Sequence, residues 1–136
     1  MLIRGPRSTA LRLAWLVLSL AWLPAWASPA RVTDVRLWSG PEGTRLVIEL
    51  SAPVEYDVFA LDDPDRIVVD LANTILPANE SLPPGQGPVK ALRSGPQQGQ
   101  GLRFVLDVTG VLKPRSFVVG PDGSAGHRLV VELPGS

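Results

Sequence analysis

Four segments of the chain alternate apolar and polar residues with a period of two, which is typical of a β-strand with one buried face. These segments cover residues 45–51, 66–71, 103–109 and 128–133. Shorter segments that also favour strands cover residues 32–38, 54–60, 89–94 and 115–119. No window shows a convincing helical stripe. The pattern predicts an all-β fold, built as a sandwich or barrel of short strands.

Segments with turn composition separate the predicted strands. Residues 39–43, 62–65, 97–101 and 120–126 are rich in glycine, proline, aspartate or glutamine. A longer segment, residues 73–88, contains four prolines and two glycines. Because proline cannot donate a hydrogen bond to a sheet ladder, we expect this segment to cross between sheets as a loop.

The strands before and after that connection repeat one another. The sequence RLVIELS at 45–51 is echoed by RFVLDVT at 103–109, and RIVVDL at 66–71 is echoed by RLVVEL at 128–133. The spacing differs between the copies only where the insertions fall in predicted loops. The repeat predicts a sandwich of two pseudo-symmetric four-stranded sheets from an internal duplication, with copies at approximately 31–72 and 88–134.

Residues 1–27 have the order of a secretory signal peptide. Three arginines without an acid precede the apolar run 13–23, and Ala25-Trp26-Ala27 provides a small-x-small cleavage site. As a helix the apolar run would rise only about 16 Å, against about 30 Å of bilayer hydrocarbon, which argues against a transmembrane anchor. We expect Sec-type export, with the domain occupying residues 28–136.

Charge and residue types exclude several kinds of site. The whole chain has 13 basic and 13 acidic residues, and without residues 1–27 the balance becomes 10 − 13 = −3. Residues 28–80 sum to −6 and residues 81–136 to +3, so the second half is the better candidate for an anionic polymer. Nucleic acid is disfavoured as a partner. No cysteine is present and His127 is the only histidine, so we expect no metal site and no cofactor.

The strand segments resemble the AMIN domain. The resemblance rests on VTDVR at 32–36, TRLVIEL at 44–50, YDVFAL at 56–61 and, most specifically, DPDRIVVDL at 63–71. Such domains occur at the N-termini of periplasmic N-acetylmuramoyl-L-alanine amidases and in pilus secretins. The resemblance implies two symmetric four-stranded sheets, a periplasmic location, peptidoglycan binding, and targeting to the envelope or division site. The zinc catalytic domain of those amidases is not in this sequence.

We therefore predict a non-catalytic, monomeric peptidoglycan-binding and targeting module rather than an enzyme. Two alternatives stay open. The chain could be the truncated N-terminal targeting part of an amidase whose zinc domain is absent here, with a catalytic amidase domain or division proteins as partners. It could also be a protein-docking module of a secretin or pilus assembly.

The candidate binding residues lie on the polar faces of the strands, where each long strand presents arginine, valine and an acid. Arginines could bind carboxylates of peptidoglycan, and acids could accept hydrogen bonds from sugar hydroxyls. The alternative is a solvated face of cross-strand ion pairs, each worth about 0–1 kcal/mol. The candidates are Arg36, Trp38, Arg45, Glu49, Arg66, Asp70, Arg93, Arg103, Asp107, Arg128 and Glu132.

Three further features have a functional and a structural interpretation. Trp38, beside a Gly-Pro turn, could be a platform for a sugar ring or could pack at the sandwich rim. Its counterpart in the second copy is Gly95. The aspartates at 62–65 lack the ligand spacing of a calcium loop and favour a hairpin turn. His127 has no partner motif and is expected to be a surface turn residue.

Overall fold

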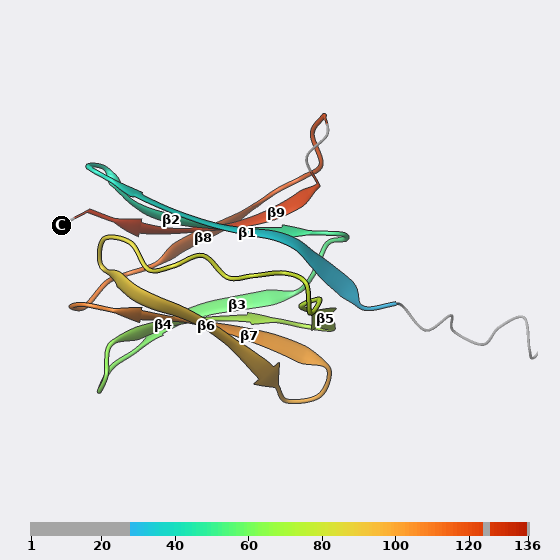
Figure 1. The fold of residues 1–136 in the computed structure, drawn as a ribbon, viewed down its shortest axis with the longest axis horizontal. Coiled ribbons are helices and arrows are strands. Elements are labelled where there is room, and N and C mark those ends of the chain that lie inside the picture. Colours follow the sequence, from blue (N-terminus) through green and yellow to red (C-terminus); the bar gives the residue numbers. More distant parts are fainter. Residues whose placement is uncertain (1–27, 124–125, 136) are drawn as a thin grey trace, which may run out of the picture.

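Two β-sheets packed face to face form the fold in the computed structural model, which describes residues 28–123 and 126–135 (Figure 1). Sheet I has the order β5 (Thr74–Ile75), β1 (Ala30–Gly40), β2 (Gly43–Leu50), β9 (His127–Pro134) and β8 (Arg115–Val119). Sheet II has the order β3 (Tyr56–Leu61), β4 (Arg66–Leu71), β7 (Gly101–Val108) and β6 (Val89–Gln97). The predicted all-β sandwich is confirmed. No helix that could cross a membrane occurs in the described part of the chain, and the signal peptide predicted at 1–27 lies outside it.

Each sheet combines one hairpin from each copy of the repeat. Sheet I joins β1–β2 of the first copy to β8–β9 of the second, and sheet II joins β3–β4 to β6–β7. The antiparallel pairs β2–β9 and β4–β7, at the centres of the sheets, link the copies. Both sheets also carry a register shift at the equivalent position, Val32/Asp34 and Val89/Ala91. Because neither copy contains a whole sheet, the two copies depend on each other for the fold.

The core lies between the sheets and is built from the inward residues of β1, β2, β4, β6, β7 and β9. Phe104, Ile48, Leu106 and Val131 are fully buried, and the alternate residues on these strands face outward. The complete cluster consists of Val32, Val35, Leu37, Leu46, Ile48, Leu50, Ile67, Val69, Leu71, Val89, Leu92, Leu102, Phe104, Leu106, Val108, Leu129, Val131 and Leu133. The period-two pattern therefore identified the core-facing side of the strands that build this cluster.

Sheet I has a fifth strand that the sequence pattern did not indicate. β5 is two residues long and pairs in parallel with Ala30 and Arg31. Asn73 precedes it with a positive φ of 46° and accepts a hydrogen bond from the Ala30 amide at 3.0 Å. A two-residue strand is too short to show alternation, so only its neighbour β1 reveals it. The rest of the connection crosses between the sheets as predicted, and Leu76 and Leu82 pack against the core.

Candidate functional site

The outward residues of each sheet form three rows that run across four strands. These strands are β1, β2, β9 and β8 in sheet I and β6, β7, β4 and β3 in sheet II. In the middle row, an arginine on the first strand is followed by two valines and a phenylalanine. On sheet I this row is Arg36, Val47, Val130 and Phe117, and on sheet II it is Arg93, Val105, Val68 and Phe59. The rows above and below contain most of the charged residues. The two outer faces of the sandwich therefore present closely similar patterns.

The middle row departs from the solvated polar face that the sequence predicted. Val68 is only 1 % exposed and Val130 only 6 %, although both point away from the core. Each lies directly opposite a phenylalanine, Phe59 or Phe117, on the neighbouring edge strand. The guanidinium carbon of Arg103 also lies 6.0 Å from the centre of the Phe59 ring. Each face is thus an apolar ridge with charged rows on both sides.

Cross-strand ion pairs connect many of the candidate residues. Arg103 donates two hydrogen bonds to Asp70, at 2.7 and 2.9 Å. At the equivalent place on sheet I, Arg45 donates one to Glu132 at 2.6 Å. These pairs leave the arginine side chains 39 % and 54 % exposed, so their remaining donors face solvent. The ion-pair interpretation and a binding role are therefore compatible at these positions.

A second set of ion pairs runs diagonally between adjacent strands. Arg93 donates two hydrogen bonds to Asp107, at 2.7 and 2.9 Å. Its counterpart Arg36 lies 3.8 Å from Glu49 and 3.4 Å from Asp34. The two hydrogen bonds of Arg93, aided by its charge, lower the pKa of Asp107 and raise the pKa of Arg93. The bonds from Arg103 to Asp70 likewise raise the pKa of Arg103. These groups therefore stay charged through the neutral range.

The candidate residues are divided between the two outer faces and do not form one site. Sheet I carries Arg36, Trp38, Arg45, Glu49, Arg128 and Glu132, and sheet II carries Arg66, Asp70, Arg93, Arg103 and Asp107. The basic residues of the second half are also divided, with Arg93 and Arg103 on sheet II and Arg115 and Arg128 on sheet I. The basic residues of the second half, which the charge balance favours for an anionic polymer, therefore do not form one surface, because the strands of the two copies are interleaved.

Two of the candidate arginines, Arg66 and Arg128, form no ion pair with the other described residues. Arg66 donates from Nη1 to the carbonyl oxygens of Asp62 and Pro64, at 3.1 and 2.7 Å, and so stabilises the β3–β4 turn. The Nε atom of Arg128 is buried and has no hydrogen-bond partner among the described residues. Its cross-strand neighbour Glu49 instead accepts a hydrogen bond from the Gly126 amide at 3.1 Å. Arg66 is consequently a weaker candidate for contact with a ligand.

Trp38 borders a hollow of about 200 Å³ on the outer face of sheet I, which we call the Trp38 hollow. Arg45, Glu132 and Arg115 follow Trp38 in one row across β1, β2, β9 and β8. The indole is 57 % exposed, so it is not packed away at the rim. Its ring lies over Gly40, where an added Cβ would be 2.4 Å from the indole Cη2. An aromatic surface, two arginines and an acid therefore meet at one concave place.

Sequence reasoning missed two residues of this hollow, Arg115 and Glu42. Arg115 begins the segment 115–119 and lies two residues before the outward Phe117. Residues two apart in a strand share a face, so the pattern indicated that Arg115 also points outward. Its position opposite Glu132 depends on the pairing of β8 with β9. Because β9 also pairs with β2 of the first copy, Arg115 joins the row that contains Arg45. Glu42 lies in the β1–β2 turn, and nothing in the pattern assigns it to this face.

The equivalent row on sheet II has different chemistry. Its members are Gly95, Arg103, Asp70 and Asp57. Glycine replaces the tryptophan and aspartate replaces Arg115, so this row has no aromatic surface and has one arginine against two acids. The duplication therefore preserved the framework of the two faces but left only sheet I with the Trp38 hollow.

A protein-family model and two individual relatives assign the chain to the same family. The profile of the AMIN domain family matches residues 34–135. The chain is 30 % identical over 112 residues to the N-acetylmuramoyl-L-alanine amidase AmiC of Escherichia coli O6:H1, a match that covers 79 % of this chain and 27 % of the amidase. It is 32 % identical over 106 residues to AmiC of Neisseria meningitidis serogroup B, covering 74 % of this chain and 26 % of that protein. The chain thus spans about a quarter of the length of these relatives.

Proposed function

The chain belongs to the AMIN domain family, and we propose that it is a non-catalytic module that binds peptidoglycan and targets the cell envelope. Family membership is the observation that carries this proposal. The two relatives are named for cleavage between N-acetylmuramic acid and L-alanine, the bond that joins the glycan and the peptide of the bacterial wall. A domain shared with such enzymes is suited to hold them at that polymer.

The Trp38 hollow supports the proposal chemically. Peptidoglycan offers sugar rings, hydroxyl groups and the carboxylates of its stem peptides. The exposed face of Trp38 suits a sugar ring, Arg45 and Arg115 suit carboxylates, and the acids suit hydroxyl groups. We propose that the remaining candidates on this face, Arg36 and Glu49, extend the contact along the strand direction, and that those on sheet II contribute less.

We propose that hydrolysis is carried out elsewhere. The match covers only about a quarter of each amidase, and the sequence contains a single histidine and no cysteine. Among the described residues, no group of three histidine, cysteine, aspartate or glutamate side chains is placed to hold a metal ion. Binding without cleavage is the activity that the described surface supports.

Location and partners follow from the same proposal. Residues 1–27 would direct export, and the domain would act in the periplasm as a monomer on the wall. A second candidate function is to deliver a wall amidase to its substrate, with the catalytic unit as a partner. Both relatives are amidases, which favours this second function over docking to a secretin or pilus.

Sedimentation with purified sacculi tests the proposal. The protein should appear in the pellet with the sacculi, and replacing Arg45 and Arg115 together by alanine should reduce the bound fraction at least tenfold. Replacing Arg103 by alanine is the matched control, because it breaks the equivalent ion pair on the opposite face. No sedimentation of the folded parent protein would refute peptidoglycan binding, and equal losses for the two variants would refute the assignment to sheet I.

A further inference from the structure

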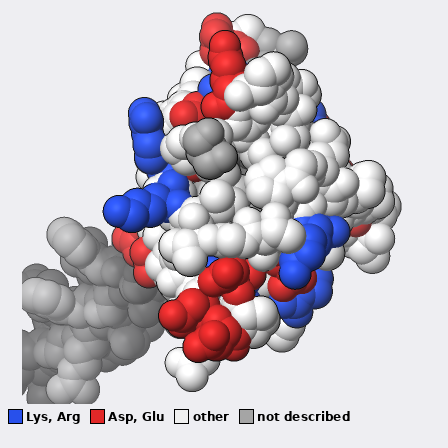
Figure 2. Space-filling view, turned by 90° about the vertical axis from the view of Figure 1, so that its left-hand side faces the viewer, with Lys and Arg blue, Asp and Glu red and all other residues white. Residues whose placement is uncertain are grey.

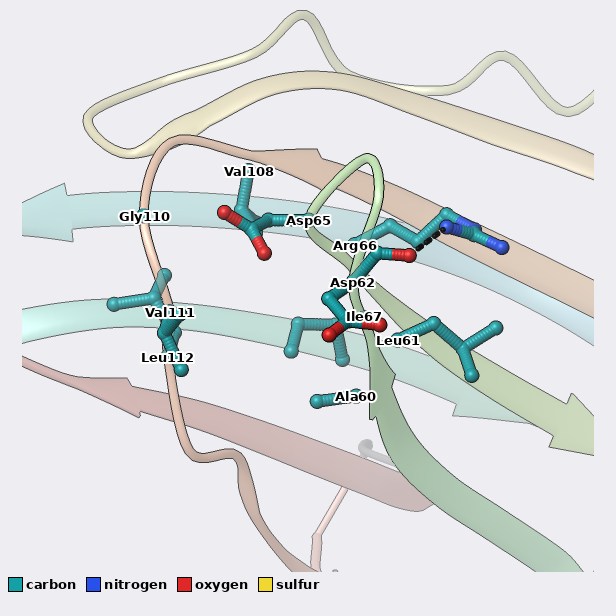
Figure 3. A pocket seen from close by; sticks show the side chains of 10 residues that line it. All are labelled: Ala60, Leu61, Asp62, Asp65, Arg66, Ile67, Val108, Gly110, Val111 and Leu112. Atoms are coloured by element: carbon teal, nitrogen blue, oxygen red, sulfur yellow. Dashed lines mark hydrogen bonds between the residues drawn. The ribbon is translucent and has the colours of Figure 1, made fainter.

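A second hollow lies at the end of the sandwich beside the β3–β4 turn, and we call it the end pocket (Figure 3). It has a volume of about 310 Å³ and separates the β3–β4 turn from the loop that follows β7. Apolar side chains form its walls, among them those of Ile67, Val111 and Leu112. Asp62 and Asp65 stand at the edge of the same space, on the turn opposite Val111 (Figure 3).

The internal duplication provides a comparison for this pocket. The equivalent positions of the other copy line a hollow of only about 40 Å³. In the end pocket they are Ala60, Arg66, Ile67, Val108, Val111 and Leu112, and their counterparts are Val118, Arg128, Leu129, Leu50, Pro53 and Val54. The strands that carry these positions are equivalent, so the side chains at the matched positions can be compared directly.

Two substitutions contribute to the larger volume of the end pocket. Ala60 stands where the other copy has the larger Val118. Tyr56 lines the small hollow and packs against the core, whereas its counterpart by the repeat offset is Pro114, which does not line the end pocket. The wall residues of the end pocket therefore lack the two side chains that fill the equivalent space.

The acidic edge of the pocket is held in place by the backbone. Arg66 donates to the carbonyl oxygens of Asp62 and Pro64, at 3.1 and 2.7 Å, and the Val108 amide donates to the carbonyl of Asp65 at 3.2 Å. In Figure 3 the guanidinium of Arg66 points away from the pocket. The edge is thus ordered without an arginine lying over the pocket.

The turn carries three aspartates, Asp62, Asp63 and Asp65, and none forms an ion pair with the other described residues. Acidic side chains gather at the lower edge of the view in Figure 2, which faces the end of the molecule where this turn lies in Figure 1. The nearest basic residue on the opposite loop is Lys113, next to Leu112. Three carboxylates against two basic residues, Arg66 and Lys113, leave this edge with a net charge of −1.

Apolar side chains next to the acidic edge are unusually exposed. Val111 is 83 % exposed and Leu61 is 39 % exposed, although both belong to elements that line the pocket. An apolar surface of this kind with a charged edge is characteristic of an interaction site. The volume is at the lower end of the range for ligand pockets, roughly 300–1,000 Å³, and so suits one or two side chains.

We propose that the end pocket is a docking site for a protein segment that inserts an aliphatic side chain and places a lysine or arginine against Asp62 and Asp65. The apolar walls select the aliphatic group, and the negative edge selects its basic neighbour. Charge complementarity of this kind chiefly raises the association rate and the specificity of an interface. The end pocket and the Trp38 hollow have no lining residue in common.

A titration followed by NMR tests this proposal with defined peptides. Acetylated and amidated Lys-Leu-Lys, added to the ¹⁵N-labelled protein at low salt, should shift amide signals of residues 60–67 and 108–112. It should leave those of the equivalent hollow, residues 50–54, in place. The peptides Glu-Leu-Glu and Lys-Ser-Lys are the controls for the charge and for the aliphatic side chain, and each should bind at least tenfold more weakly.

Matched variants connect the effect to the pocket. Replacing Asp62 and Asp65 together by asparagine should weaken binding of Lys-Leu-Lys at least tenfold. Asp122→Asn, in the equivalent β8–β9 turn, should have no effect. Ala60→Val, which copies Val118, should also weaken binding by filling the pocket. Because these residues lie at the surface or in a turn, the fold should be retained, which the unshifted signals of the core will show.

Three results would overturn the proposal. Lys-Leu-Lys could fail to shift the signals of the pocket, Glu-Leu-Glu could bind as well as Lys-Leu-Lys, or the Asp62→Asn/Asp65→Asn variant could bind unchanged. Sedimentation with sacculi separates this site from the proposed function. The pocket variants should sediment like the parent protein, and loss of sedimentation would instead make the end pocket part of the peptidoglycan site.

Discussion

Replacing Trp38 by alanine is expected to weaken binding to peptidoglycan about twentyfold without unfolding the protein. The indole presents roughly 250 Å² of surface in total and is 57 % exposed, which leaves about 140 Å² in water. A sugar ring stacked on one face would cover about half of this area, about 70 Å². At about 25 cal/mol per Å² the lost contact is worth about 1.8 kcal/mol, and about 1.4 kcal/mol corresponds to a factor of ten in affinity.

Two further variants separate the presence of the ring from its position. Trp38→Phe keeps an aromatic face and should lose less than Trp38→Ala. Gly40→Ala keeps the indole but places a Cβ 2.4 Å from the present position of its Cη2, so the ring must move. Because the ring end can rotate while the strand stays paired, Gly40→Ala should weaken binding with little change in stability.

The assay is sedimentation with sacculi over a range of concentrations, supported by tryptophan fluorescence. Within residues 28–136, Trp38 is the only tryptophan, so the difference spectrum between the parent protein and Trp38→Phe reports on this ring. Glycan fragments should change the parent signal and leave that of Trp38→Phe unaltered. An affinity of Trp38→Ala within twofold of the parent value would refute the reasoning, because the exposed indole would then make no contact with the ligand.

Three other changes test the fold and the second face. Gly95→Trp combined with Asp57→Arg rebuilds the Trp38 row on sheet II, where a Cβ at Gly95 meets nothing within 4 Å, and should raise the amount of protein bound to sacculi severalfold. Asp107→Asn removes the negative charge and one of the two oxygens that accept hydrogen bonds from Arg93, and should lower the free energy of unfolding by up to about 1 kcal/mol at pH 7. Since those bonds lower the pKa of Asp107 below its ordinary value of 3.8, the stabilisation is present above about pH 4 and lost as the pH falls, so the stabilities of the two proteins in urea should converge as the solution is acidified below about pH 4. Phe104→Ala removes a fully buried ring and should lower the free energy of unfolding by about 3–5 kcal/mol in urea; a loss below about 1 kcal/mol would contradict its place in the core.

The interleaved topology explains how one duplicated sequence can carry different functions at equivalent places. Because each sheet takes a hairpin from each copy, substitutions in one copy alter both faces of the sandwich. Trp38 and Arg115 come from different copies and meet only on sheet I. The end pocket arises in a similar way, since Ala60 and Val111 belong to different copies. A substitution in one copy therefore changes contacts with strands of the other copy, and its effects are not confined to one half of the molecule.

The alternation of apolar and polar residues was sufficient to place the strands and their buried faces. Leu46, Ile48 and Leu50 are buried as the period of two requires, and so are Phe104, Leu106 and Val108. The repeat of these segments also predicted the pseudo-symmetry, because equal patterns occupy equal environments. Outward directions follow from the same period, so Trp38 and Arg45 were correctly expected on a polar face.

The tertiary structure decided which strands are neighbours, and with them the composition of each site. A period of two defines the two sides of a strand but not the strand beside it, since every long strand offers the same pattern of arginine, valine and acid. Pairing of β2 with β9 and of β9 with β8 brought Arg45, Glu132 and Arg115 into one row. Burial of Val68 and Val130 on an outward face likewise depends on a phenylalanine from an edge strand. The sequence by itself therefore determined the elements and their orientation, whereas contacts between distant segments, which no local pattern records, determined the hollows and the ridges.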